Sequence, residues 1–442
     1  MEILIKILQF VAALSLLVII HELGHFLFAK LFKCRVEKFY LFFNPWFSLF
    51  KFKKGDTEYG IGWLPLGGYV KISGMIDESM DTDQMKQPPK PYEFRSKPAW
   101  QRLLIMVGGV LMNVVLAIAI YIGMSMHYGD SYYKTEDINA VYGFEFSELA
   151  RQAGFQNGDK IINIDGNPIE NSGDINITLL LDDVDYVEVE RSGGIVRIPM
   201  HSQYIAAMLK SGTAFARPFA PLIVDETFPD GGAAQAGLRP GDRIVALNGT
   251  PVSAVNNLIA QHGGETVELE ILRDSAGYTQ TLFQPVAVSQ EGMIGVGLMQ
   301  ISIPVSHKTY NFFQAIPQGF KRAKTEIANY FKQLKLIFTP ETEAYKQVGG
   351  IIAIGNIFPG QWNWQFFWSI TAMLSIMLAV LNLLPIPGLD GGHVMFVLYE
   401  MIARRKPSDK FMEYAQWVGL ILLLFLLVYA NGNDVVKLFT KG

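Results

Sequence analysis

Cysteine is almost absent from this sequence of 442 residues, which contains only Cys34. A single cysteine excludes an intrachain disulfide framework and a zinc site built from cysteine ligands. A strong excess of one charge is also missing, because 37 basic and 41 acidic residues leave a formal net charge of −4. The composition therefore carries no electrostatic signal for nucleic-acid binding.

Charged residues are scarce in four long segments, although the chain as a whole contains many. The sequence is 50% hydrophobic, and a helix of about 20 apolar residues is long enough to cross a bilayer. We expect spans at Ile3–Leu31, Leu103–Met124, Phe366–Leu384 and Met412–Tyr429. The first segment also lacks the small-residue cleavage site of a secretory signal, so it is expected to remain as a span. The chain is predicted to be a polytopic membrane protein with soluble domains.

Basic residues concentrate in two of the connections between these spans. Cytoplasmic loops of membrane proteins are enriched in lysine and arginine. We therefore expect both connections to be cytoplasmic, and both termini and the segment from 125 to 365 to lie in the periplasm, across a bacterial inner membrane. The basic residues are Lys30, Lys33, Arg35, Lys38, Lys51, Lys53, Lys54, Arg95, Lys97 and Arg102 in the first connection, and Arg404, Arg405 and Lys406 in the last.

The first apolar segment contains an HExxH motif at residues 21–25. At about 100° per helical residue, His21, Glu22 and His25 share one side of a helix. Two imidazoles at this spacing suit zinc, and the carboxylate beside them is free to accept a proton from water. Charged groups at the centre of a bilayer cost about 2.5–3.5 kcal/mol each. A metal site explains their presence better than histidines that are merely packed in a core.

A further ligand is expected where the third apolar segment ends, in the stretch Asn382 to His393. Two prolines and three glycines interrupt the helix there and leave an acidic residue at membrane depth. A catalytic zinc ion usually has three protein ligands and one open position. We predict Asp390 as the third ligand, with His393 as the alternative.

The first basic connection is rich in aromatic and β-branched residues from Val36 to Gly74, which predicts strands and hairpins. Its stretch Gly60–Lys71 is apolar but interrupted by glycine and proline. Irregular backbone at membrane depth is tolerated where protein covers it or where it lines a wet cavity. We interpret this stretch as a re-entrant β-loop bordering the metal site, and an ordinary cytoplasmic hairpin is the competing interpretation. Asp77–Pro91 is predicted to be a polar connector.

Two further features leave alternatives open. Gly109 and Asn113 lie four residues apart in the second apolar segment, where close helix packing and a catalytic role explain them equally well. After Ser306, apolar residues recur every three or four positions with basic residues between them, which predicts an amphipathic helix. Such a helix fits the outer membrane surface and also fits packing against the preceding domains.

The long segment between the second and third spans contains an internal repeat. Residues 153–169 read AGFQNGDKIINIDGNPI, and residues 236–252, which follow 83 positions later, read AGLRPGDRIVALNGTPV. Each copy predicts a helix end, a turn, a short strand and a hairpin turn. The repeat resembles tandem PDZ domains, which bind an extended peptide or a chain terminus beside a strand edge. The sequence leaves open whether these domains bind peptide or act as spacers.

Together, the HExxH motif, the Asn382–Asp390 segment, the Gly67–Lys71 loop, Gly109 to Asn113 and the repeat resemble the site-2 protease family of intramembrane zinc metalloproteases, in its RseP type. The resemblance covers essentially the whole chain. It implies Zn²⁺ as cofactor and cleavage of single-pass transmembrane proteins. Such substrates include anti-sigma factors already cut outside the membrane by a site-1 type protease, and signal-peptide remnants.

The expected site follows from the motifs and the resemblance together. His21, His25 and Asp390 are the predicted zinc ligands, and Glu22 is the predicted general base. A helical substrate has to unwind before its carbonyl groups become accessible, and the loop is expected to hold it as an added strand. The resemblance assigns the handling of the substrate to Gly68, Tyr69, Val70, Lys71, Asn382, Pro385 and Pro387.

The predicted fold is a polytopic α-helical membrane protein with four transmembrane helices, a membrane-associated β-hairpin region and two periplasmic PDZ-like α+β domains. Two other classes of function conflict with the sequence. A membrane-anchored protease for soluble proteins conflicts with the apolar residues around the HExxH motif, and a non-catalytic PDZ receptor with a structural metal leaves Glu22 without a role. The expected segments are the first helix (1–32), the β-loop region (33–101), the second helix (102–125), the first PDZ-like domain (126–218), the second PDZ-like domain (219–304), the amphipathic helices (305–362), the third helix with its Asp390 segment (363–403), and the fourth helix (404–442).

Overall fold

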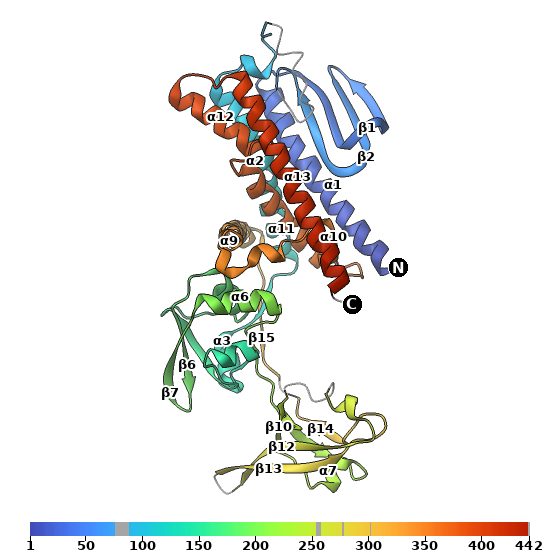
Figure 1. Cartoon of the computed structure of the whole chain (residues 1–442), viewed down its shortest axis with the longest axis vertical. Coiled ribbons are helices and arrows are strands. Elements are labelled where there is room, and N and C mark those ends of the chain that lie inside the picture. The colour runs from blue at the N-terminus through green and yellow to red at the C-terminus, as the bar shows by residue number, and fades with distance from the viewer. Residues whose placement is uncertain (76–87, 253–257, 276–277, 301, 441–442) are drawn as a thin grey trace. The chain divides into compact units, whose positions relative to one another are not determined.

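The computed structural model describes residues 1–75, 88–252, 258–275, 278–300 and 302–440 (Figure 1). Two compact units make up the chain. One combines Met1–Asp130 with Lys308–Gly442, and the other is Ser131–His307. We call them the helical unit and the inserted unit. The polar connector predicted at Asp77–Pro91 lies outside the described residues as far as Gln87.

Four long apolar helices form the frame of the helical unit (Figure 1). A helix rises about 1.5 Å per residue, so even 20 residues reach across the roughly 30 Å of a bilayer core. The four apolar spans predicted from the sequence are therefore confirmed as helices of spanning length. They are α1 (Glu2–Leu31), α2 (Ala99–His127), α11 (Trp364–Leu383) and α13 (Asp409–Thr440).

The end of α11 shows how local sequence positions the site. The helix begins where the Asn363 side chain accepts a hydrogen bond from the backbone N–H of Phe366 at 2.9 Å. It ends before Pro385, since proline cannot donate to the helical ladder. After Gly388, whose φ of +96° favours glycine, the chain starts a separate helix, α12 (Asp390–Ala403). The region predicted as one transmembrane segment, 363–403, thus contains two helices, and Asp390 opens the second.

Close approach of α1 and α2 depends on glycine. A Cβ atom on Gly24 would collide with the carbonyl oxygen of Gly108, and one on Gly108 would lie 2.7 Å from the carbonyl oxygen of Gly24. Small residues at such a crossing let two backbones touch within a membrane. On another side of α2, Ser375 of α11 donates a hydrogen bond to the carbonyl of Asn113 at 2.8 Å. Helix α2 therefore packs directly against both α1 and α11.

The hairpin region consists of two long strands, β1 (Val36–Lys54) and β2 (Thr57–Ile72), which lie beside α1. Both strands bend, so Lys38 pairs with Glu58 in one part of β2 and with Lys71 in another. Positive φ angles at Phe42, Trp46 and Gly67 mark the bends. The result is a small sheet with two edges, formed by residues 48–54 and 68–72.

Helix α9 (Phe312–Ile337) belongs to the helical unit and matches the predicted amphipathic helix. Asn311 and Gln314 form a capping box at its start. Gly319 packs against Ile122 of α2, and Arg322 forms an ion pair with Asp130. The packed face of α9 thus contacts α2 and α11, a placement that neither sequence interpretation anticipated. The helical unit also contains α10 (Ile351–Ile357), η2 (Phe94–Ser96), η4 (Pro340–Thr342) and η5 (Ala344–Gln347).

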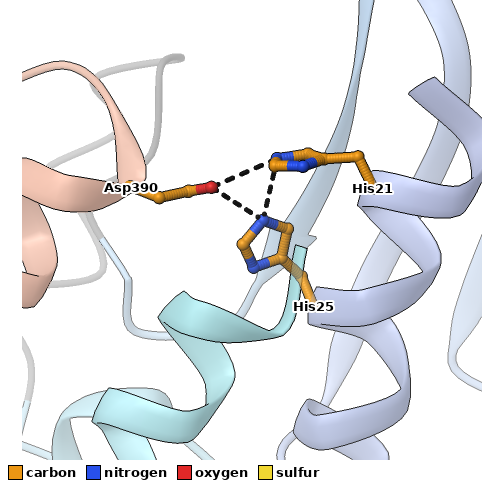
Figure 2. Close-up of side chains that lie close together, drawn as sticks. All are labelled: His21, His25 and Asp390. Carbon is orange, nitrogen blue, oxygen red and sulfur yellow. Dashed lines mark hydrogen bonds and ion pairs between the residues drawn. The ribbon is translucent and has the colours of Figure 1, made fainter. Parts of the chain in front are cut away.

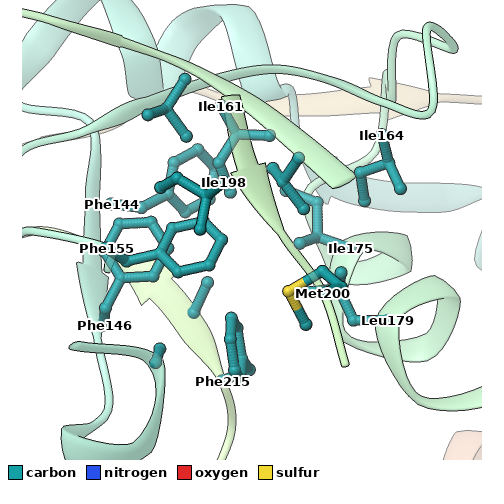
Figure 3. Packing of buried hydrophobic residues seen from close by; sticks show 14 of the residues in the cluster. Phe144, Phe146, Phe155, Ile161, Ile164, Ile175, Leu179, Ile198, Met200 and Phe215 are labelled. Carbon is teal, nitrogen blue, oxygen red and sulfur yellow. The ribbon is translucent and has the colours of Figure 1, made fainter. Parts of the chain in front are cut away.

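The inserted unit contains two hydrophobic cores, one within the predicted domain 126–218 and one within 219–304. Figure 3 shows the first core, in which Phe144, Phe155 and Phe215 are fully buried. Its strands are β4 (Phe144–Phe146) with β8 (Ala216–Pro218), and β5 (Lys160–Ile164), β6 (Tyr186–Arg191) and β7 (Gly194–Pro199). Its helices are α3 (Thr135–Val141), α4 (Glu148–Gln152), α5 (Gly173–Leu181) and α6 (Ser202–Ser211).

The second core lies on a larger sheet with neighbouring strands in the order β13 (Tyr278–Ala287), β12 (Thr266–Ser275), β10 (Arg243–Leu247), β9 (Leu222–Thr227) and β14 (Val296–Leu298). Strands β3 (Asp130–Tyr133) and β15 (Val305–Lys308), through which the chain enters and leaves the unit, pair with each other. The remaining elements of this part are α7 (Gly232–Gln235), β11 (Thr250–Pro251) and η3 (Ala260–His262).

The sequence repeat corresponds to a repeated polar contact. In the first copy the buried carboxylate of Asp159 accepts two hydrogen bonds from Arg191, at 2.7 and 2.6 Å. In the second copy Asp242 accepts two from Arg273, both at 2.7 Å. The hydrogen bonds that Arg191 donates to Asp159 raise the pKa of Arg191 above its usual range, so the guanidinium stays charged. The Gly-Asp dipeptide therefore has the same structural role in both copies.

Candidate metal centre

His21 and His25 lie one turn apart on α1 and are both buried. The Nδ1 atom of His25 is 2.8 Å from the backbone carbonyl oxygen of Ile105 on α2. A carbonyl only accepts, so Nδ1 carries the proton and donates it. In neutral His25 the Nε2 atom then keeps its lone pair, as a metal ligand requires.

Space for the two imidazoles comes from Gly109 of α2. A Cβ atom there would collide with Nε2 of His25 and would lie 2.6 Å from Cε1 of His21. Only glycine fits at this position, because the two imidazole rings project from α1 into the space that a side chain would occupy. The two adjacent glycines of α2 therefore have different roles: Gly108 sets the helix crossing, and Gly109 accommodates the histidines.

Asp390 reaches the same point from α12 (Figure 2). Its Oδ2 atom lies 3.1 Å from Nε2 of His21 and 3.3 Å from Nε2 of His25, and the two Nε2 atoms are 3.2 Å apart. As the first residue of a helix, the carboxylate also benefits from the positive end of the helix dipole. Three side chains from two distant parts of the sequence thus direct one atom each to a common point.

These three atoms fit a metal ion better than a set of hydrogen bonds. Oδ2 of Asp390 is buried, and among the described residues it has no hydrogen-bond partner outside the triangle. A proton can bridge one edge of such a triangle, whereas a divalent cation contacts all three atoms. Zinc bonds of about 2.0–2.2 Å at tetrahedral angles place neighbouring ligand atoms roughly 3.3–3.6 Å apart, close to the observed separations. Two imidazoles and one carboxylate are also a donor set that zinc prefers.

The triangle opens into a cavity of about 740 Å³ within the helical unit. Glu22 lines this cavity, together with Gly68, Tyr69, Val70 and Lys71 at one edge of the small sheet. A Cβ atom on Gly68 would lie 2.6 Å from Cγ1 of Val18 and 3.5 Å from Cγ of Glu22. The sheet edge therefore lies directly beside the HExxH helix.

The residues predicted around Asp390 occupy two kinds of position. Asn382 lines the cavity, with its Nδ2 atom 3.4 Å from Nε2 of His21. Pro385 and Pro387 are not among the described residues that line the cavity. The backbone of Pro387 instead packs against Gly392 of α12 and Gly419 of α13. The prolines therefore belong to the backbone that holds Asp390 rather than to the cavity wall.

His393, the alternative third ligand, is separate from the triangle. Within the described parts of the chain, the cluster able to hold a metal consists of His21, His25 and Asp390. His393 lies one helical turn after Asp390, 3.3 Å from the Nε2 atom of Gln416 on α13. It lines the main cavity and a smaller one of about 290 Å³, so it forms part of the wall between them.

Sequence reasoning missed several residues of the cavity. Phe43, Asn44 and Pro45 line it from the bend of β1, and the hydroxyl of Tyr69 donates to Oδ1 of Asn44 at 2.9 Å. These residues reach the cavity because β1 folds back on itself. The Asn44-Pro45 dipeptide, which is typical of turns, is a local signal for this bend. The bend itself has residues with positive φ that are not glycine, Phe42 and Trp46, which sequence rules do not anticipate.

Comparisons with known proteins identify the family of this chain. The chain matches the family model described as peptidase family M50 over residues 9–426. It is 30% identical to a protein of Clostridium perfringens that carries the name zinc metalloprotease, across 96% of both chains. It is 25% identical to the regulator of sigma E protease of Haemophilus influenzae, over 97% of this chain and 98% of the relative.

The protease RseP of Yersinia pestis is 26% identical to this chain, over 99% of the chain and the full length of the relative. Such matches extend over the apolar helices, the HExxH motif and Asp390. The family uses zinc, and the expected resemblance to site-2 proteases is confirmed. The chain therefore belongs to peptidase family M50 and is a zinc metalloprotease of the membrane.

Proposed function

We propose that this zinc metalloprotease cleaves single-pass transmembrane proteins within the membrane, with zinc held by His21, His25 and Asp390. The observation that carries the proposal is the position of the ligand triangle. It lies between apolar helices of spanning length and beside an edge of the small sheet. A protease for soluble proteins has no need of a site within such helices, because buried polar groups are costly there.

Zinc bound at this site supplies Lewis acidity, which polarises a carbonyl group and makes a water molecule easier to deprotonate. Glu22 lies next to His21 in the sequence and lines the same cavity. Its carboxylate accepts the proton from the attacking water and later delivers it to the departing amine of the peptide bond. The burial of the two histidines preserves the alignment of the ligands.

The substrate has to reach the site as extended chain, because helical carbonyls are already hydrogen-bonded. Residues 68–72 form an edge that pairs with β1 on one side and faces the cavity on the other. We propose that Gly68, Tyr69, Val70 and Lys71 bind the unwound substrate as an added strand. Main-chain hydrogen bonds then replace those that the substrate helix loses.

Asn382, Pro385 and Pro387 complete the proposed substrate-handling set. Asn382 lines the cavity near His21 and is available to bind backbone groups of the substrate. The prolines act indirectly, since they keep the segment between α11 and α12 from continuing as a helix. In this way they hold open the route beside Asp390.

The identity of the substrates is proposed from the relatives and from charge. Relatives are named as RseP and as a regulator of sigma E protease. We therefore propose anti-sigma factors, cut first by an upstream site-1 type protease, and signal-peptide remnants as substrates. The basic residues flanking the helices support an inner-membrane protein with its active site toward the cytoplasm and the inserted unit in the periplasm.

For the inserted unit we propose two PDZ-like domains that restrict access. The chain enters and leaves this unit through the paired strands β3 and β15, so the unit is tethered between α2 and α9. A cleavage site that reads backbone has few side-chain contacts with which to choose substrates. We propose that the unit excludes bulky periplasmic domains and admits substrates that have already been trimmed. Capture of a new chain terminus in a PDZ groove is the alternative.

The test of the proposed function is Glu22→Gln in the full-length protein. The amide fills the same space but cannot accept a proton, so we expect wild-type zinc content and a loss of cleavage of at least about 10²-fold. Glu2→Gln at the exposed start of the same helix is the matched control. Undiminished cleavage by Glu22→Gln would remove Glu22 from the mechanism. The inactive variant would also identify natural substrates, as the membrane proteins that accumulate with it.

A further inference from the structure

Asn113 is a fully buried side chain on α2 whose role the sequence left open. Its Nδ2 atom lies 3.2 Å from Nδ1 of His21, on the side of the ring away from the ligand triangle. Its Oδ1 atom is buried and has no hydrogen-bond partner among the described residues. An unpaired buried amide oxygen costs roughly 1–3 kcal/mol, so this arrangement calls for an explanation.

The orientation of the amide determines which nitrogen of His21 is protonated. If the NH₂ group donates to Nδ1, neutral His21 carries its proton on Nε2, the atom directed at His25 and Asp390. A protonated Nε2 cannot bind a metal. The two ends of an amide have the same shape and are told apart by their hydrogen bonds. Turning the amide brings Oδ1 to Nδ1–H and leaves the lone pair of Nε2 directed at the triangle.

We propose that Asn113 is a positioning residue for zinc, which accepts a hydrogen bond from Nδ1 of His21 and thereby fixes the tautomer and plane of that ring. The inference rests on the ligand set in the proposed function. With this role for Asn113, each of the two histidines donates a hydrogen bond from Nδ1 to a carbonyl group of α2. The backbone carbonyl of Ile105 orients His25, and the side-chain carbonyl of Asn113 orients His21.

The surroundings make Asn113 a rigid support. The carbonyl group of its own backbone accepts a hydrogen bond from Ser375 of α11 at 2.8 Å, which anchors this turn of α2. Gly109, one turn earlier, keeps the adjacent space clear for the rings. Partners that orient a metal-bound imidazole typically contribute 10- to 100-fold to metal affinity. Loss of the acceptor should therefore weaken zinc binding in that range.

The experiment measures the zinc dissociation constant of the purified full-length protein by competition with a chelator, alongside its thermal melting. Asn113→Leu keeps the approximate volume and removes the acceptor, so we expect zinc affinity to fall 10- to 100-fold. Asn113→Asp keeps an acceptor oxygen, and we expect it to bind zinc as tightly as wild type or more tightly. Gly123→Ala on the same helix is the control, because a Cβ atom there meets nothing within 4 Å, and its zinc affinity should stay within threefold of wild type.

Two outcomes would overturn the inference: Asn113→Leu binding zinc within threefold of wild type, or Asn113→Asp losing as much affinity as Asn113→Leu while both melt like wild type. If Asn113→Leu does not fold, Asn113→Ala removes the same acceptor and is judged by the same limits. His21→Ala distinguishes this failure from that of the proposed function. Unchanged zinc binding by His21→Ala would refute the ligand set itself, whereas weak binding there with normal binding in Asn113→Leu refutes only the role of Asn113.

Discussion

The proposed role of Asp390 as a zinc ligand requires a charged carboxylate among apolar helices, and the position of that carboxylate accounts for the cost of the charge. The only described groups that approach its buried Oδ2 atom within ion-pair distance are the Nε2 atoms of His21 and His25. A cation shared by these three atoms offsets the loss of hydration of the carboxylate. The charge of Asp390 should therefore matter more than its size.

Replacement of Asp390 by asparagine tests this dependence on charge. The neutral amide is a much poorer zinc ligand than a carboxylate, so we expect Asp390→Asn to lose zinc and activity together. His393→Ala should lose much less of either, since His393 lies outside the ligand cluster. Zinc per chain by metal analysis, with cleavage of a model substrate, checks both variants. The reverse order of effects would show that the third ligand has been assigned wrongly.

Gly109 provides a second test at the residue scale, because its missing side chain makes room for the ligands. In Gly109→Ala the new methyl group would lie 2.6 Å from Cε1 and 2.8 Å from Nδ1 of His21. We expect zinc affinity to fall at least tenfold, measured by chelator competition. Gly123→Ala on the same helix is the control, since a Cβ atom there meets nothing within 4 Å. Equal zinc affinity in the two variants would contradict this account.

At the scale of elements, the small sheet has two edges that differ in what they face. Residues 68–72 line the cavity, whereas residues 48–54 form the opposite edge. Only the first is positioned to add a substrate strand. Along a strand, successive N–H groups point to opposite sides, so one of two neighbouring residues donates toward the substrate.

Proline substitution tests strand addition, because proline removes one backbone donor. We expect Tyr69→Pro or Val70→Pro to keep fold and zinc content while losing at least tenfold in cleavage rate. Lys51→Pro and Phe52→Pro provide the matched pair on the opposite edge, where at least one should retain full cleavage. Melting curves, zinc content and product formation are measured for all four. If Tyr69→Pro and Val70→Pro both fold and both cleave at the wild-type rate, the substrate does not bind along this edge.

The helices could be predicted from sequence more completely than the site. Long runs of apolar residues predict α1, α2, α11 and α13, because a helix is one of the few structures that can cross a bilayer. The HExxH motif placed two histidines on one face by helical geometry alone. The coordination chemistry of zinc predicted Asp390 as the third ligand. The contact between Asp390 and the histidines depends on the position of α12, which begins about 370 residues after the HExxH motif.

What the sequence could not determine were contacts set by packing between distant elements. The choice between a packing and a catalytic role for Asn113 depends on how α2 lies against α1. The Phe43–Pro45 part of the cavity wall depends on a bend in β1. The helix α9 shows the same limit: the sequence predicted its amphipathic pattern and left the partner of its apolar face open, and that face contacts α2 and α11.

At the scale of the whole molecule, a large inserted unit interrupts a membrane protease between two of its spans. The strands β3 and β15 pair at the point where this unit joins the chain. Removal of residues 134–304 with a short flexible linker in their place therefore leaves the helical unit with its own contacts. The filter and capture models predict opposite results for such a variant.

Under the filter model, deletion of residues 134–304 releases cleavage of substrates that still carry a bulky periplasmic domain. Under the capture model, it weakens cleavage of trimmed substrates. We expect the first result, measured by cleavage of matched trimmed and untrimmed substrates. A deletion variant that is folded and active on trimmed substrates, yet leaves untrimmed ones uncut, would refute the filter.

The central claim is that cleavage takes place within the membrane and uses the site on α1. Its most direct test is mass spectrometry of the products formed by the purified protein in lipid vesicles that contain a single-pass substrate. We predict that the new termini lie within the apolar segment of the substrate and that Glu22→Gln produces none of them. Termini confined to the polar flanks, or the same products from Glu22→Gln, would contradict the account.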